Sequence, residues 1–205
     1  VFERACLEAN VTCEVLLLSS MRSLQTTNLT FCNITTCKQV TVHSLHQAIQ
    51  HHVKSQYMIL LPFDHVITEL NLQEHIGILQ SNDHITLVGS KITETKKYTF
   101  QHQAFVLPNE TYTVIRNYGF KAAYISNQKA DLYENLKGFN ALDSRSMTVQ
   151  FVPAVSLAGL TMRKQDFEAM QLEVHSLFTN KYPFDGADLS MQVLETAGIN
   201  SIAIS

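Results

Sequence analysis

The sequence of 205 residues contains no tryptophan, 4 prolines, 7 glycines and no apolar run long enough to cross a bilayer. A helix that spans a membrane needs about 20 apolar residues in succession, so we expect no membrane span in this chain. The scarcity of proline and glycine, with no internal repeat, leaves no linker that could divide the chain. With 45% apolar residues the chain can bury a full core, and we expect a single domain over residues 1–205.

Charged residues are also few, at 16% of the chain, and the net charge is −3. A surface with this balance gives no electrostatic reason for DNA, RNA or an anionic membrane to bind. No secretory leader is recognisable and the chain opens at Val1, so we expect a mature or excised part of a longer protein.

Cysteine is confined to the first part of the chain, at Cys6, Cys13, Cys32 and Cys37. Their spacings match no usual zinc motif. The pattern therefore favours two disulfides that pin an N-terminal segment, residues 1–40. Disulfides persist in oxidising compartments, which indicates a secreted or lumenal protein.

Sequons for N-linked glycans support the same compartment. The N-x-[ST] form occurs at Asn10, Asn28, Asn33 and Asn109, and three of these four sites lie in the cysteine-bearing segment. We expect N-linked glycans at these asparagines, and a location in the lumen of the secretory pathway (Golgi or endoplasmic reticulum) or outside the cell.

Short apolar runs alternate with helical patterns along the N-terminal half. Strands are expected at 13–20, 56–61 and 84–90, a surface loop at 21–40, and helices over 40–55 and 72–83. Further along, we expect strands at 102–107, 111–120, 122–126 and 201–205, an extended segment at 147–160, and helices over 130–138, 163–178 and 184–198. Alternating strands and helices predict a three-layer α/β sandwich with a mostly parallel central sheet, Rossmann-like in its N-terminal half.

In open sheets of this type, ligands bind beyond the carboxyl ends of the strands. The first expected strand ends at Ser19 and Ser20, the second runs into Asp64 and His65, and the third ends at Gly89. These residues are therefore the candidates for a ligand site.

The order of these pieces resembles the GT-A-type glycosyltransferase domain, and within that group the N-terminal domain of the fukutin-related proteins. The resemblance runs over residues 13–205 and is carried by "CEVLLLSS", "SLHQAIQHHVKSQYMILLPFDH", "EHIGILQSNDHITLVGSKI", "YTVIRNYGF", "VPAVSLAGLTMRKQDF" and "YPFDGADLSMQVLETAGI". It implies a lumenal enzyme that transfers a sugar or sugar phosphate from a nucleotide-sugar donor to a glycan or glycoprotein acceptor.

The resemblance also implies a divalent metal, usually Mn²⁺, that neutralises the diphosphate of the donor. Asp64 and His65 stand where the family has an Asp-x-Asp pair, which this sequence lacks. A turn after Pro62 is needed for both side chains to reach one metal, because neighbours on a strand point to opposite faces. A water-facing turn aspartate is the other interpretation of Asp64. Ser19, Ser20 and Gly89 are the candidates for contacts with the donor.

Asp185 and Asp188 are the candidates for the base that activates the acceptor hydroxyl. Both also lie where an acid stabilises a helix start, by capping it or by offsetting its dipole, so the two interpretations stay open. The missing second carboxylate favours a different function, a catalytically silent binding or assembly module. The sequons and cysteines also suit the ectodomain of a cell-surface or viral glycoprotein that recognises a protein partner.

Overall fold

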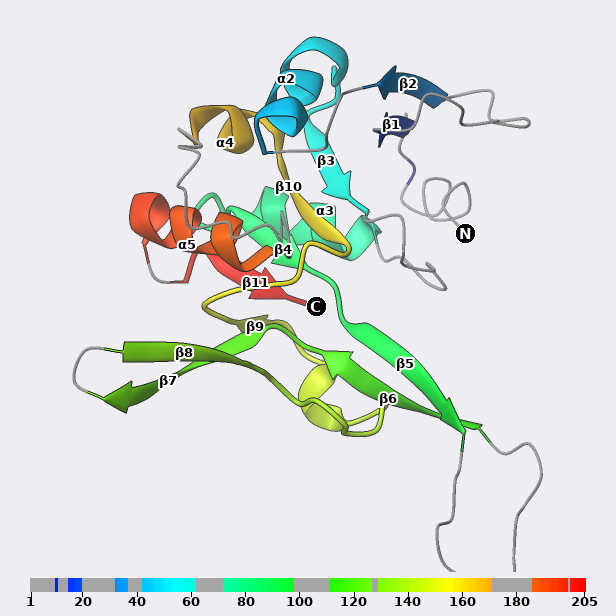
Figure 1. Ribbon diagram of the computed structural model, residues 1–205, viewed down its shortest axis with the longest axis vertical. Coiled ribbons are helices and arrows are strands. Elements are labelled where there is room, and N and C mark those ends of the chain that lie inside the picture. Colours follow the sequence, from blue (N-terminus) through cyan, green and yellow to red (C-terminus); the bar gives the residue numbers. More distant parts are fainter. Residues whose placement is uncertain are drawn as a thin grey trace, which may run out of the picture.

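The computed structural model describes residues 10, 15–19, 32–36, 42–61, 72–97, 111–126, 129–170, 186–198 and 200–205. Its helices and strands lie in an upper group that contains every helix labelled in Figure 1 and a lower group of long strands. In chain order they are β1 (Val15–Ser19), β2 (Cys32–Thr36), α2 (Val42–His52), β3 (Tyr57–Leu60), α3 (Leu72–Ser81), β4 (Leu87–Gly89), β5 (Ile92–Lys97), β6 (Thr111–Asn117), β7 (Phe120–Ser126), β8 (Lys129–Glu134), η1 (Ser144–Ser146), β9 (Gln150–Phe151), β10 (Leu160–Arg163), α4 (Lys164–Ala169), α5 (Gly186–Ala197) and β11 (Ile202–Ile204).

The central sheet has five strands in the order β3-β10-β4-β11-β9. Strand β10 is antiparallel to both of its neighbours, β3 and β4, and β11 is parallel to β4 but antiparallel to β9. Three of the four pairings are therefore antiparallel. The predicted three-layer sandwich with a mostly parallel sheet is wrong: the protein is a mixed α/β structure with mostly antiparallel strands.

The insertion of β10 is the physical reason for this difference. Met162, in the middle of β10, pairs with Met58 of β3 on one side and with Leu87 of β4 on the other. Strands β3 and β4 run in the same direction, as a strand–helix–strand unit requires, yet they are not neighbours. All four residues of β10 are buried, which suits a central strand.

The two faces of the sheet bury two apolar clusters, because side chains alternate along each strand. On one face, Leu160 and Met162 pack in a cluster with residues of α2, α4 and α5. The helix residues of this cluster are Ile49, Phe167, Leu189 and Val193. The opposite face carries Val88 and Ala203, which pack with Leu79 of α3. Helix α3 therefore covers one face, and α2, α4 and α5 cover the other.

Two antiparallel pairs, β5–β6 and β7–β8, form the lower group in Figure 1. The chain passes from β6 to β7 through a turn in which Gly119 has φ of 69° and its N–H donates to Asn117 Oδ1 at 2.9 Å. The helix predicted over 130–138 is wrong, because Lys129–Glu134 is strand β8. Leu132 pairs there with Ala122 of β7.

The described residues of the N-terminal region form a parallel pair, β1–β2, in which Val15 pairs with Cys32. Strand β2 lies inside the segment expected to be a loop. Cys6, Cys13 and Cys37 lie outside the described residues, so the disulfides stay a prediction. None of the helices in the described ranges has the length and apolar character needed to cross a bilayer.

Candidate functional site

Most of the residues proposed from the sequence for a transferase site lie outside the described ranges. These are Ser20, Asp64, His65 and Asp185. Ser19 is the last residue of β1, and Asp188 lies near the start of α5. Within the described ranges, no group of three or more histidines, cysteines, aspartates or glutamates could hold a metal ion. The Mn²⁺ and nucleotide-sugar sites therefore stay predictions.

Gly89 is the one proposed donor contact with a described side-chain environment. A Cβ atom built on it would lie 2.5 Å from Val155 Cγ1 and 2.6 Å from Val155 Cβ. Carbon atoms that are not bonded to each other do not approach so closely, so the packing of β4 against Val155 requires a glycine at this position. This packing requirement is a sufficient reason for Gly89, and no contact with a ligand is needed to explain it.

A buried histidine is the next candidate. His75 of α3 shares a hydrogen bond of 2.7 Å, Nδ1 to Oγ1, with Thr161 of β10. Its side chain is only 2% exposed, and this burial lowers its pKa to about 4, so the imidazole is neutral at physiological pH. A neutral ring closed off from solvent by helix and sheet holds α3 in place and offers no access to a substrate.

Arg163 is also buried, at the end of β10, where its guanidinium closes the C-terminus of α3. It donates to the carbonyl oxygens of Leu79, of Asn82 at 3.1 Å and of Ile85 at 2.9 Å. Asp166 completes the site through an ion pair of 2.9 Å. A cation at this end of a helix satisfies carbonyls that have no partner within the helix and complements its dipole. The role of Arg163 is structural.

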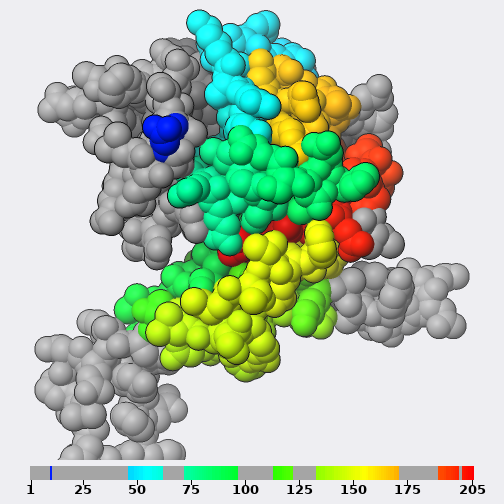
Figure 2. Space-filling model, turned by 180° about the vertical axis from the view of Figure 1, so that it is seen from behind, coloured from blue at the N-terminus to red at the C-terminus, as the bar shows by residue number. Residues whose placement is uncertain are grey.

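The strongest candidate is an exposed apolar surface on residues 139–151, which we call the 139–151 surface. Eight large apolar side chains are exposed within the described ranges, and five of them lie in this short segment. The five are Phe139, Leu142, Met147, Val149 and Phe151. Figure 2 shows the segment, in yellow-green and yellow, open to solvent across the lower half of the coloured surface. Single exposed apolar residues are ordinary, but a cluster of this kind marks a contact site.

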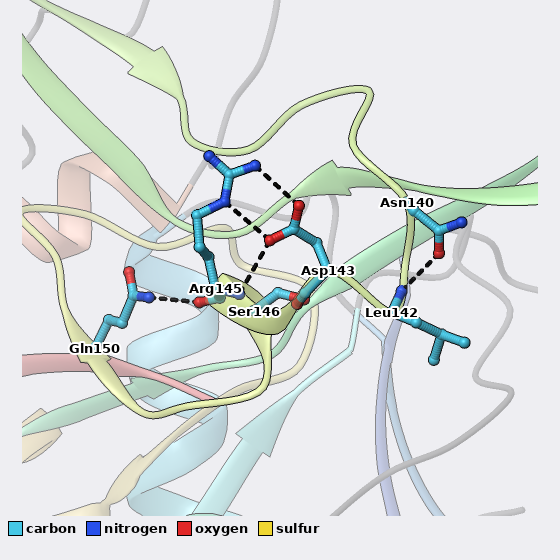
Figure 3. A network of polar contacts seen from close by, with 6 residues as sticks. All are labelled: Asn140, Leu142, Asp143, Arg145, Ser146 and Gln150. Carbon is cyan, nitrogen blue, oxygen red and sulfur yellow. Dashed lines mark hydrogen bonds and ion pairs between the residues drawn. The ribbon is translucent and has the colours of Figure 1, made fainter.

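A network of polar contacts fixes the shape of this surface (Figure 3). Arg145 donates to both carboxylate oxygens of Asp143, at 2.9 Å from Nε and 2.8 Å from an Nη, and its backbone N–H donates to the same carboxylate at 3.0 Å. These bonds lower the pKa of Asp143 to about 2, so the carboxylate stays ionised. The Arg145 guanidinium also lies 4.2 Å from the centre of the Phe139 ring. The two charges of the segment are therefore paired with each other, and the Arg145 guanidinium also packs on the ring of Phe139.

Further bonds complete the network along the chain. Asn140 Oδ1 accepts from Leu142 N–H at 2.9 Å, and the side-chain hydroxyl of Ser146 donates to Asp143 O at 2.8 Å. The amide of Gln150 donates to the carbonyl oxygen of Arg145. Gln150, near the end of the segment, thus bonds to its short 3-10 turn, η1, whereas Asn140 stabilises the turn just before it.

Neighbouring strands anchor the segment to the rest of the protein. Phe139 O accepts from Ile115 N–H at 2.7 Å, and Ala141 N–H donates to Thr113 O at 3.1 Å, so the segment begins as a partner of β6. The buried Tyr118 donates its hydroxyl to Thr148 O, and burial raises the pKa of Tyr118 to about 12. The segment then ends in β9, at the edge of the central sheet. The segment is therefore anchored at one end to β6 and at the other to the central sheet.

Sequence reasoning missed this surface for an identifiable reason. Apolar residues are assigned to the core by default, and those of residues 139–151 follow neither a helical nor a continuous strand period. The available signal was the turn chemistry of Asn140 and Asp143, whose side chains bond the backbone two residues further on. A segment with such turns exposes much of its length.

Comparison with protein-family models, with curated proteins and with solved structures finds no match to this chain.

Proposed function

We propose that this chain is a protein-binding module of a secreted or lumenal glycoprotein and that it binds its partner through the 139–151 surface. The observation that carries the proposal is the gathering of five exposed apolar side chains on one segment whose backbone is held by hydrogen bonds. Full burial of one such side chain contributes about 1.5–3 kcal/mol. Five partly exposed ones therefore offer on the order of 5 kcal/mol to a partner that covers them.

The fixed shape of the surface increases what a partner can gain. Binding is weaker when a loop must first be ordered, because the lost conformational entropy opposes association. A surface that is already ordered avoids this cost. The contacts of Asp143 with Arg145, and of Tyr118 with Thr148, hold residues 139–151 in place without a partner. This distinguishes the segment from an apolar loop that could fold back onto its own core.

Strand addition at a sheet edge is the competing mode of protein binding. The accessible edge of the β5–β6 pair is β5, since residues 138–141 bond to the other side of β6. Strand β5 carries Glu94 and Lys96, which form an ion pair of 2.7 Å. Charged residues on an edge strand oppose the addition of another strand. The side chains of residues 139–151 are therefore the better contact site.

The glycosyltransferase function suggested by the resemblance lacks support of this kind. Asp64, His65 and Asp185, on which it depends, are outside the described residues, and the parallel sheet that it implied is not what the described strands form. It stays a prediction from the sequence. The secretory compartment is part of our proposal, because cysteines and sequons are concentrated in one segment.

Site-specific photo-crosslinking tests the proposed contact. A benzophenone amino acid replaces Leu142, which is 79% exposed at the proposed contact, or Met191, which is 45% exposed on α5 and serves as the matched control. The chain is produced through the secretory pathway of cultured cells and irradiated there. We expect a protein adduct of defined mass from position 142 that the added substitution Met147→Glu removes, and none from position 191. Equal labelling from both positions, or none from 142, would contradict the proposal.

A further inference from the structure

We infer that the partner which covers the 139–151 surface is a second copy of this chain, so that the protein forms a two-fold symmetric dimer. The inference rests on the proposed function, since it names the partner of that same surface. In a two-fold interface the same patch of both copies meets, so its charges and its shape must be compatible with those of an identical patch.

The charges of the surface meet this condition. Residues 139–151 contain one acid and one base, Asp143 and Arg145, and these are joined to each other. Two charged neighbours are also engaged within the chain: Lys91 Nζ donates to Ala141 O at 3.1 Å, and Lys137 pairs with Glu134. Two copies can therefore meet here without repulsion between like charges. A partner selected by electrostatic steering would need unpaired charges on this surface.

The composition of the surface fits the centre of a homodimer interface. Such centres are rich in aromatic residues, methionine and arginine, and poor in lysine, glutamate and aspartate. Here Phe139 and Phe151 supply aromatic rings, and Met147, which is 63% exposed, supplies a thioether that adapts to an opposing surface. Ser144 and Thr148 are exposed polar residues of the same segment and suit a hydrated rim.

The surface has the parts of an ordinary dimer interface. Stable dimers bury about 800 Å² on each partner, with an apolar centre and a polar surround. The five apolar side chains form such a centre, and β9 brings the edge of the central sheet to the same place. A neutral lipid surface is the other occupant for an uncharged apolar patch, and the experiment separates it from a second chain.

Sedimentation equilibrium of the purified, glycosylated chain over a wide concentration range is the test. We expect a monomer–dimer equilibrium that Leu142→Glu and Met147→Glu each weaken at least about tenfold, because residues central to an interface carry most of its binding energy. Met191→Glu is the matched control and leaves the equilibrium unchanged. Leu142, Met147 and Met191 are all exposed before the change, so circular dichroism is expected to show an unchanged fold.

Three results would overturn the inference. The first is a chain that stays monomeric at every concentration. The second is a dimer that both patch variants leave intact, since the interface then lies elsewhere. The third is a monomer that co-sediments with phosphatidylcholine vesicles, which assigns the surface to lipid. If the chain is monomeric while position 142 still crosslinks to a different protein in cells, the inference fails and the proposed function stands.

Discussion

His75 of α3 and Thr161 of β10 share a hydrogen bond of 2.7 Å although 86 positions separate them in the sequence. The bond joins the helix on one face of the central sheet to β10, an interior strand of that sheet. Because the imidazole is buried and has a pKa of about 4, its protonation is linked to the stability of the fold.

We expect the free energy of unfolding to fall as the pH drops from about 6.5 towards 4. The unfolded chain binds a proton at His75 in this range and the folded chain does not, so acid favours unfolding. Between these two pKa values the loss amounts to about 3 kcal/mol, and none of it is present above pH 6.5.

Urea unfolding at a series of pH values measures this loss. In His75→Gln the slope between pH 6.5 and 4 becomes flatter, whereas His84→Gln, at an exposed histidine, leaves it unchanged. An equal slope in all three proteins would contradict the linkage to His75.

Replacement of Arg163 by methionine is expected to destabilise the protein by about 3 kcal/mol or more, since Asp166 and the carbonyls of Leu79 and Asn82 at the end of α3 lose their buried partner. Arg163→Lys recovers only part of this, because one ammonium group cannot reproduce the fork of a guanidinium. Urea unfolding measures both changes. The control is Arg116→Met, at an exposed arginine of β6, which changes stability by no more than about 0.5 kcal/mol.

Two glycines respond oppositely to replacement by alanine. Gly89→Ala forces a Cβ against Val155 and is expected to cost about 1–3 kcal/mol, part of which Val155→Ala restores in the double variant. Gly77 lies within α3 and has no atom within 4 Å of an added Cβ, so Gly77→Ala stabilises by about 0.5–1 kcal/mol. Thermal unfolding of the three variants checks the signs. A neutral Gly89→Ala would remove the packing reason for that glycine.

Asp143 is expected to control the order of the 139–151 surface. In Asp143→Ala the Arg145 side chain loses both carboxylate contacts and η1 loses its cap, so the amides of Arg145 and Ser146 exchange hydrogen faster. Asp143→Asn keeps one acceptor for the cap and changes exchange less. Hydrogen exchange followed by mass spectrometry measures this. Amides that exchange equally in all three proteins would show that the network does not fix the segment.

Asn10 offers a direct test of the secretory interpretation. It is exposed, in a turn with φ of 52°, and the third residue of its sequon is Thr12. We expect Asn10→Gln to remove one glycan from the chain made in a secretory host, which a mass shift after enzymatic deglycosylation detects. Thr12→Ala gives the same loss. Thr12→Ser keeps the sequon and serves as the control.

Local structure was predictable wherever a short segment contained its own helix or turn pattern. Apolar residues at helical spacing predicted α2 and α5, and Gly198, with φ of 83°, ends α5 as expected. The core face of α3 was predicted less well: Leu72 and Leu79 are buried, but His75 is buried with them. From the sequence alone a histidine is assigned to the surface, because the hydrogen bond that allows its burial, here with Thr161, is not evident.

Pairing between distant segments was not predictable from these signals. The pattern of residues 130–138, closed by Gly138, is typical of a short helix, yet pairing with β7 makes Lys129–Glu134 a strand. The central place of β10 depends on β3 and β4, which precede it by about a hundred and about seventy positions. The turn residues Asn140 and Asp143 were a local signal that residues 139–151 are exposed, but the contacts with β6 and Tyr118 that fix the segment join distant residues and were not predictable.

The position of β10 has a consequence for biosynthesis. A ribosome releases β3, α3 and β4 well before it reaches Leu160, so these elements emerge without the strand that must lie between them. Until then the apolar edges of β3 and β4 have no native partner, and loop closure over this distance is slow. The nascent chain thus passes through a stage that needs protection from aggregation, and chaperones that bind nascent chains are suited to provide it.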